Sequence, residues 1–246
     1  MIRKFFMAIA GLTLFCASTA QAQDITPDQK KAFEKVIRDY LIQNPTIIRE
    51  ALTALQAREE AEKQARQKQA LQNRKAELVN DPAAPVAGNP KGDVTVVEFF
   101  DYNCGYCKRV WPMIGALMQA DKKIRVVFKE FAILGPGSLA AAKAALAADR
   151  QGKYLEFHTE LMRARGINDR AIDAIAKKLG LDVKKLRADM KRPEIEAALQ
   201  KNYRLAEDLG ISGTPAFVIG DTMVPGAIGP EQLAAMIAAE RAKKKK

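Results

Sequence analysis

Apolar residues recur at helical spacing near the start of the chain. The first stripe follows an i, i+3, i+4, i+7, i+8 pattern and consists of Phe33, Val36, Ile37, Tyr40 and Leu41. Asn44 and Pro45 interrupt it, and we expect Asn44 to cap a second helix with Pro45 at its first position. Leu41, Ile48 and Leu55 are each seven residues apart, which is typical of a coiled-coil seam. The pattern therefore predicts two amphipathic helices.

The stripe fades after Leu55, and residues 56–77 are mainly Gln, Ala, Arg, Glu and Lys. A helix of this composition buries little apolar surface. Residues 81–92 (DPAAPVAGNPKG) are rich in turn formers, so we expect a linker there. Because the polar stretch and the linker separate the stripe from the rest of the chain, we predict a helical oligomerisation stalk over residues 23–80 that packs against copies of itself.

The pattern changes to that of a buried strand just after the linker. Val94–Phe100 (VTVVEFF) is strongly apolar and rich in β-branched residues. Residues 104–119 have helical periodicity, with Pro112 as an expected kink, and Ile124–Phe131 is a second apolar run. These segments predict a strand–helix–strand unit.

The remainder predicts a helical stretch followed by a return to strand. Helix signals between residues 138 and 209 are the caps and stops Asn168, Gly180, Asp182 and Gly210. Thr214–Ile219 is again strand-like, the chain turns back through Met223 and Val224, and Gly229-Pro230 opens a final helix. We therefore predict an α/β domain with one sheet over residues 93–246, with a helical insertion at about 136–209.

The first 22 residues resemble a secretory signal. Arg3 and Lys4 precede a short apolar run, and Ala20-Gln21-Ala22 supplies the small residues that signal peptidase reads. The apolar run is shorter than the ~20 residues of a membrane span, although an uncleaved anchor stays open as an alternative. We expect a signal peptide over residues 1–22, cleaved after about Ala22, and an exported protein.

Charge changes this picture little. The chain carries 40 Lys and Arg against 29 Asp and Glu, which gives a formal net charge of +11. Such an excess is common in nucleic-acid-binding proteins, but export argues against a nucleic-acid partner. We interpret the basic run Arg241–Lys246 as a solvated end.

Two cysteines carry the candidate chemistry. Loss of the leader removes Cys16 and leaves Cys104 and Cys107 in the motif C-G-Y-C. A disulfide between them closes a very small loop and stabilises little, so we predict a redox-active pair. Cys104 follows a strand and opens a helix, where unpaired N–H groups stabilise a thiolate. Cys104 is the predicted nucleophile, and Cys107 is predicted to resolve the mixed disulfide.

The alternatives for this pair are a structural disulfide and half of a zinc site. Zinc needs about four ligands, and His158 is the single histidine of the chain. Carboxylates or a second chain could complete such a site, but no spacing suggests them. We therefore expect no metal and no cofactor, and we interpret His158 as an ordinary, partly buried residue.

Glu98 is a third candidate. It lies in the apolar strand six residues before Cys104. Burial there would raise the pKa of the carboxyl group; the alternative is a strand residue that faces solvent. Lys129 is a weaker candidate for its partner.

Residues 93–240 resemble the DsbA-type branch of the thioredoxin superfamily. The motifs that carry this resemblance are VEFFDYNCGYC at 97–107, KEFAILG at 129–135 and ISGTPAFVIG at 211–220. The segment VIRDYLIQNPTIIREAL at 36–52 is similar to the suppressor-of-copper-sensitivity protein C group. The resemblance implies a thioredoxin-like fold, a trimerising stalk and location in the periplasm.

The resemblance also implies roles for individual residues. Pro215 would be a cis-proline that faces the cysteines, and Thr214 would offer backbone groups to an extended substrate. Glu98 would help to move a proton to or from Cys107. The Gly105-Tyr106 dipeptide matches that of the disulfide isomerase DsbC. Thr214, directly before the proline, also matches the isomerase.

These features predict a periplasmic protein disulfide oxidoreductase that favours isomerisation. Its expected partners are misfolded or disulfide-bonded exported proteins, a membrane protein that sets its redox state, and copies of itself, with a trimer favoured. Two alternatives stay open, a DsbA-like dithiol oxidase and a copper-handling protein that binds Cu(I) through the same thiols. A chaperone-like scaffold that does not need the thiols is a further class.

Overall fold

The computed structural model describes residues 25–244, which fall into two compact units with a boundary between Arg58 and Glu59. The expected signal peptide, Cys16 and the cleavage position at Ala22 lie outside the described residues. Within the described range, no helix has both the length and the apolar character needed to cross a membrane.

The first unit is helical. Helix α1 (Pro27–Gln43) begins with a capping box in which Thr26 and Gln29 satisfy each other's backbone amides. Asn44 ends this helix, since its side-chain amide donates to the carbonyl of Tyr40 at 2.9 Å. The chain then continues into α2 (Thr46–Asn73), which crosses the boundary between the units. Asn44 is therefore the C-cap of α1. The sequence had instead predicted it as the N-cap of the next helix, α2.

The predicted apolar stripe is exposed. No residue of α1 is buried. The exposed large apolar side chains of this unit include Phe33, Val36, Ile37, Tyr40, Ile48, Leu52 and Leu55. The apolar face of residues 25–58 is thus open to solvent in the single chain.

The second unit is built on one mixed sheet with strand order β1-β3-β2-β4-β5. The strands are β1 (Val86–Gly88), β2 (Val94–Phe100), β3 (Ile124–Glu130), β4 (Ala216–Ile219) and β5 (Thr222–Pro225). Strands β2 and β3 are parallel, and the other neighbours are antiparallel. The strand–helix–strand unit and the hairpin expected from the apolar runs are both present.

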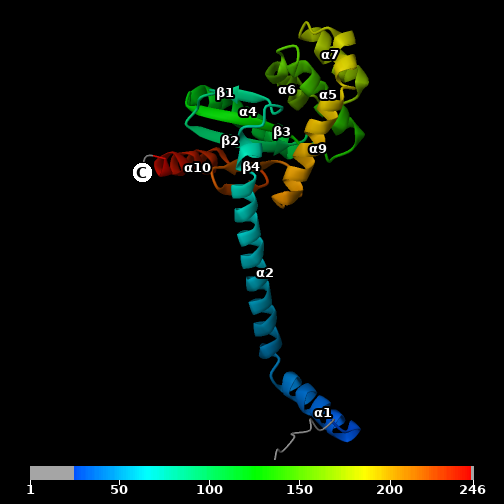
Figure 1. Cartoon of the computed structure of the whole chain (residues 1–246), viewed down its shortest axis with the longest axis vertical. Coiled ribbons are helices and arrows are strands. Elements are labelled where there is room, and N and C mark those ends of the chain that lie inside the picture. The colour runs from blue at the N-terminus through cyan, green and yellow to red at the C-terminus, as the bar shows by residue number, and fades with distance from the viewer. Residues whose placement is uncertain (1–24, 245–246) are drawn as a thin grey trace, which may run out of the picture. The chain divides into compact units, whose positions relative to one another are not determined.

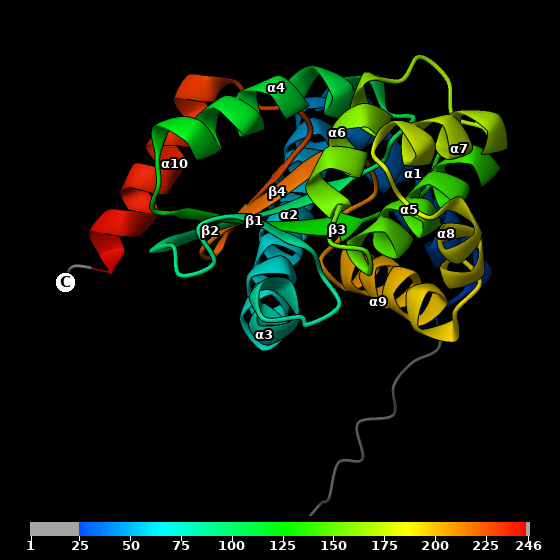
Figure 2. The same cartoon turned by 90° about the horizontal axis from the view of Figure 1, so that it is seen from above.

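Helices cover both faces of this sheet (Figures 1 and 2). One face carries α4 (Gly105–Ala120) and α10 (Pro230–Lys243), and the other carries α3 (Lys75–Val79) and the end of α9 (Pro193–Asp208). The helical insertion lies at one end of the sheet. It consists of α5 (Pro136–Asp149), α6 (Tyr154–Arg163), α7 (Asp169–Lys178), α8 (Val183–Asp189) and α9.

The stretch between the stripe and the sheet differs from the prediction of a stalk to residue 80 and a linker at 81–92. Leu71 and Leu78 are 4% and 2% exposed and belong to the core on the α3 face. Residues 86–88 form the edge strand β1, paired with β3. Two isolated leucines and a three-residue strand are too short to produce a period in the sequence, so the pattern could not reveal them.

Asp81 fixes this stretch by a buried ion pair. Its carboxylate lies 2.8 Å from the Lys129 ammonium, with side chains 4% and 0% exposed, and 3.2 Å from the Lys201 ammonium. The suggested pairing of Lys129 with Glu98 is therefore wrong. In the β2–β3 register Glu98 faces Phe128 and Phe99 faces Lys129. Since side chains alternate along a strand, Glu98 and Lys129 lie on opposite faces of the sheet.

Candidate active site

Cys104 is the N-cap of α4. Its sulfur accepts a hydrogen bond from the backbone amide of Cys107 at 3.4 Å. Val94–Phe100 delivers the chain to this position as a central strand, and the turn that follows closes with a hydrogen bond from the Cys104 amide to the Asp101 carbonyl. The sulfur thus lies at the positive end of the helix dipole, which stabilises a thiolate.

The loop before β4 faces this sulfur. The Thr214–Pro215 peptide bond is cis, as the family resemblance implies. The thiol of Cys104 donates to the carbonyl oxygen of Thr214 at 3.2 Å. The sheet brings the two segments together because β4 pairs with β2.

Cys107 has a different environment. Its side chain is 0% exposed, whereas Cys104 is 6% exposed, and both are free thiols in this structure. Burial raises the pKa of the Cys107 thiol, and the charge of Glu98 adds to the effect. The two sulfurs are therefore chemically unequal, one at a helix terminus and one in the apolar interior.

Glu98 lies on the α4 face of the sheet and is 1% exposed. Burial raises the pKa of its carboxyl group from 4.5 to about 8. Its Oε2 atom has no hydrogen-bond partner among the described residues. When Glu98 is ionised, its negative charge opposes ionisation of the Cys107 thiol, an effect smaller than that of burial.

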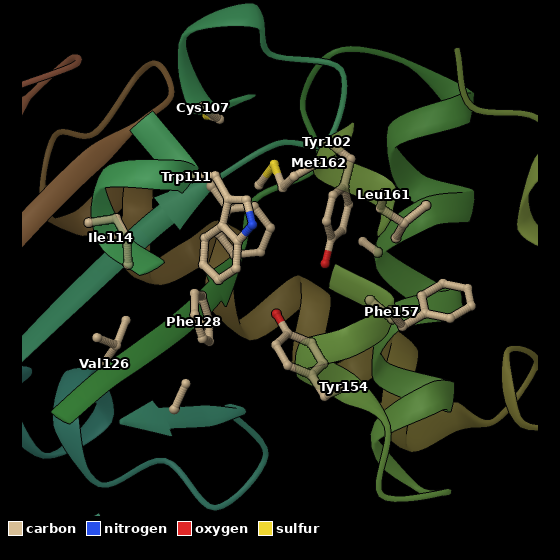
Figure 3. Close-up of a cluster of buried hydrophobic side chains, with 14 of the residues drawn as sticks. Tyr102, Cys107, Trp111, Ile114, Val126, Phe128, Tyr154, Phe157, Leu161 and Met162 are labelled. Carbon is tan, nitrogen blue, oxygen red and sulfur yellow. The ribbon is translucent and has the colours of Figure 1, made fainter. Parts of the chain in front are cut away.

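A second buried polar cluster, which the sequence did not reveal, lies beside these groups. The hydroxyls of Tyr102 and Tyr154 both donate to Oε1 of Glu130 at 2.9 Å. Figure 3 shows the two hydroxyl oxygens turned toward each other. The Tyr102 hydroxyl also lies 3.0 Å from Nδ1 of His158. This cluster joins the turn before the cysteines to helix α6 of the insertion.

Aromatic rings seal this region from water. The His158 ring packs at centroid distances of 4.4 Å from Trp111, 4.8 Å from Phe128 and 4.9 Å from Phe100. His158 is fully buried, not partly buried as expected, and burial lowers its pKa to about 3. Burial likewise raises the pKa of Glu130. The interior around His158 and Glu130 is thus enclosed and strongly favours neutral groups.

Asp101 is a further residue of the site that the sequence pattern did not predict. It is 1% exposed, and its carboxylate accepts four hydrogen bonds at 2.7–2.9 Å. The donors are the backbone amides of Asn103, Ile133 and Leu134 and the hydroxyl of Ser138. These bonds fasten the turn before Cys104 to the loop after β3. An acid that directly precedes an aromatic residue and the C-x-x-C motif was the available signal.

The two residues between the cysteines form the exposed rim of the site. Gly105 and Tyr106 are exposed, and Tyr106 is 59% exposed. The guanidinium of Arg109 lies 4.2 Å from the centre of the Tyr106 ring, a cation–π contact. In the described part of the chain, no group of three or more His, Cys, Asp or Glu side chains could hold a metal ion.

Residues 95–238 match the sequence profile of the DSBA-like thioredoxin domain. The chain belongs to the DSBA-like thioredoxin domain family. Residues 29–62 also match the N-terminal domain of the copper resistance protein ScsC, in the segment where the sequence resembled that group.

Solved structures agree with this assignment. A thioredoxin-like oxidoreductase from Silicibacter pomeroyi DSS-3 is 49% identical, with a TM-score of 0.66 over 69% of this chain and 97% of that one. ScsC of Proteus mirabilis, in a transitional conformation, is 35% identical, with a TM-score of 0.66 over 89% of this chain and 99% of that one.

Curated proteins give a similar but more distant match. The thiol:disulfide interchange protein DsbA of Bordetella parapertussis is 29% identical over 144 residues, which cover 55% of this chain and 68% of that protein. The chain spans about a quarter, 24%, of the length of the Na(+)/H(+) antiporters NhaA of Salinispora that it also matches.

We predict that Glu98→Gln raises the free energy of unfolding relative to the wild type by an amount that grows with pH. The folded state holds the Glu98 proton up to about pH 8, whereas an unfolded glutamate releases it near pH 4.5. The stability that this proton provides is fully present below about pH 4.5. It is lost at about 1.4 kcal/mol per pH unit up to about pH 8. Between about pH 5 and pH 8 the variant should therefore gain about 4 kcal/mol relative to the wild type.

Urea unfolding across this range measures the difference directly. Glu34→Gln, at a side chain 64% exposed on α1, is the matched control and should show no such gain. A Glu98→Gln difference that does not change with pH would contradict the buried, neutral carboxyl group.

Proposed function

We propose that this protein is a periplasmic thiol–disulfide oxidoreductase that acts on protein disulfides and favours their isomerisation. The observation that supports this most strongly is the Cys104 sulfur at the α4 N-terminus, 3.2 Å from the Thr214 carbonyl. A reactive sulfur beside a backbone carbonyl suits a disulfide within an extended polypeptide.

The reaction begins with the Cys104 thiolate. It attacks one sulfur of a substrate disulfide, so that a Cys104–substrate bond forms and the other substrate cysteine leaves as a thiolate. In isomerisation, a substrate thiolate then attacks the mixed disulfide and expels Cys104, with no net change in electrons. In reduction, Cys107 attacks the Cys104 sulfur instead, which leaves an oxidised Cys104–Cys107 pair and a fully reduced substrate.

Cys107 must lose its proton before it can attack. Burial raises its pKa and therefore opposes spontaneous ionisation. Glu98 has a pKa of about 8 and lies on the face of the sheet that α4 covers, which supports a role in accepting that proton and returning it. We therefore assign Glu98 to proton exchange with Cys107, and Cys104 to attack on the substrate.

The rim residues Gly105, Tyr106, Thr214 and Pro215 are the proposed substrate-binding set. Strand addition needs a free backbone edge, and the Thr214 carbonyl faces the reacting sulfur. The exposed Tyr106 ring offers an apolar surface beside it.

Isomerisation is favoured over oxidation on two grounds. The Gly105-Tyr106 dipeptide and Thr214 match the isomerase pattern noted in the sequence. The exposed apolar face of residues 25–58 supports association of several chains, with a trimer favoured, and several sites around one misfolded substrate aid reshuffling. A membrane redox partner would keep the cysteines reduced; an oxidising partner would make the same site an oxidase.

Copper handling is the second candidate. It is favoured by the match of residues 29–62 to a domain named for copper resistance in ScsC. Two thiolates are suitable soft ligands for Cu(I). In that case the two cysteines would contribute alike, whereas the oxidoreductase uses them in sequence.

We predict that serine substitutions at the two cysteines have different effects on activity. Cys104→Ser should lower disulfide reduction by more than about 1,000-fold, because it removes the covalent route altogether. Cys107→Ser should still attack substrates and accumulate mixed disulfides, because release is slowed. Insulin reduction and non-reducing electrophoresis measure both effects. Equal behaviour of the two variants, with equal loss of Cu(I) binding, would favour the copper function instead.

The stripe should control assembly. We expect Ile37→Glu in the full chain to give a monomer by light scattering, because it places a charge in the apolar face. Its dithiol chemistry should persist, while refolding of a scrambled substrate should fall by about tenfold or more. Arg38→Glu adds the same side chain next to the stripe and should leave the assembly intact. A monomeric wild type would refute the oligomer.

A further inference from the structure

A groove of about 690 Å³ runs along helix α4 beyond the cysteines. Lys108, Pro112 and Gly115 of α4 form one side, and Leu155, Met162 and Arg163 of α6 form the other. We refer to it as the α4–α6 groove. It is distinct from the rim formed by Thr214 and Tyr106.

The groove lies on the same face of α4 as the nucleophile. Cys104, Lys108, Pro112 and Gly115 follow one another at intervals of four, four and three residues, which keeps them on one side of a helix. At ~1.5 Å per residue, Gly115 lies about 16 Å along the helix from Cys104. A polypeptide bonded to Cys104 can therefore follow this face into the groove.

Nothing in the described part of the chain requires a glycine at position 115. A Cβ atom built on it meets nothing within 4 Å, so close packing does not require glycine there. Its φ angle is not in the left-handed region. Glycine inside a helix is less stable than alanine. A side chain at this position would occupy open space in the α4 wall of the groove.

The lining has a distinct chemistry. Its apolar walls include Leu155 and Met162, and the charged side chains that line it, Lys108 and Arg163, are both cationic. Lys108 is partly buried and donates to the carbonyl of Ala164. The Arg163 side chain is 71% exposed and lies 3.6 Å from Glu160, and such a solvent-exposed ion pair is weak. An occupant that combines apolar and acidic side chains complements these walls.

We propose that the α4–α6 groove is a specificity site for the polypeptide substrate. It binds an apolar side chain next to a carboxylate, located about five residues from the substrate cysteine. The spacing follows from the 16 Å distance and the ~3.3 Å rise of an extended chain. This inference rests on the proposed function, because it assumes that Cys104 attacks polypeptide disulfides.

Two peptides test the proposal with the full, reduced protein. Each carries a central cysteine joined by a disulfide to thionitrobenzoate, whose release is coloured. The first has Leu-Glu five residues to either side of the cysteine, and the second has Ser-Lys at the same positions. Attack by Cys104 on the peptide sulfur forms the mixed disulfide and expels thionitrobenzoate as the thiolate. The first peptide should react about tenfold faster at limiting concentration.

Variants then test whether the groove causes the preference for the first peptide. Arg163→Glu should remove or reverse it, while Arg165→Glu, two residues away and outside the groove lining, should leave it unchanged. Gly115→Leu should fill the groove from its α4 side and remove the preference, while the rate with Ellman's reagent stays unchanged. Gly115→Ala should raise the melting temperature, because alanine favours the helix.

The outcomes separate the two proposals. If both peptides react equally and no groove variant changes the ratio, the specificity site is refuted and the oxidoreductase function stands. If neither peptide reacts with the wild type while Ellman's reagent does, the proposed action on polypeptide disulfides fails instead.

Discussion

The site depends on one hydrogen bond, from the backbone amide of Cys107 to the sulfur of Cys104 at 3.4 Å. It makes a cysteine the N-cap of α4 and places that sulfur at the positive end of the helix. The surrounding structure maintains this contact. Strand β2 delivers the chain to the cap, the four hydrogen bonds of Asp101 fix the intervening turn, and β4 brings the Thr214 carbonyl to the sulfur.

Burial then makes the two cysteines different. The α4 face of the sheet collects Cys107, Glu98, Glu130 and His158 in a region enclosed by aromatic rings. Every pKa shift in this region favours the neutral form, upward for the acids and downward for the histidine. The helix dipole favours negative charge at the N-terminus of α4, whereas the buried acids and the Cys107 thiol retain their protons.

The sequence predicted the parts that have strong local signals. Val94–Phe100 forms a strand with the predicted bounds, because six of its seven residues are apolar or β-branched, and Asn168 and Asp182 are the expected N-caps. Contacts between distant segments were missed. Leu71 and Leu78 pack on the sheet without any period around them, and Asp81 pairs with Lys129 on the face opposite Glu98. Strand register decides that face, and a single sequence does not reveal register.

Alkylation of the reduced, native protein distinguishes an attacking cysteine from a resolving one. A brief pulse of iodoacetamide at neutral pH, followed by peptide mass spectrometry, reports which sulfur reacts. We expect Cys104 to be labelled first and Cys107 to be protected until urea unfolds the protein, because Cys107 is 0% exposed and burial raises its pKa. Labelling of Cys107 at an equal or greater rate in the native protein would contradict the division between an attacking and a resolving cysteine.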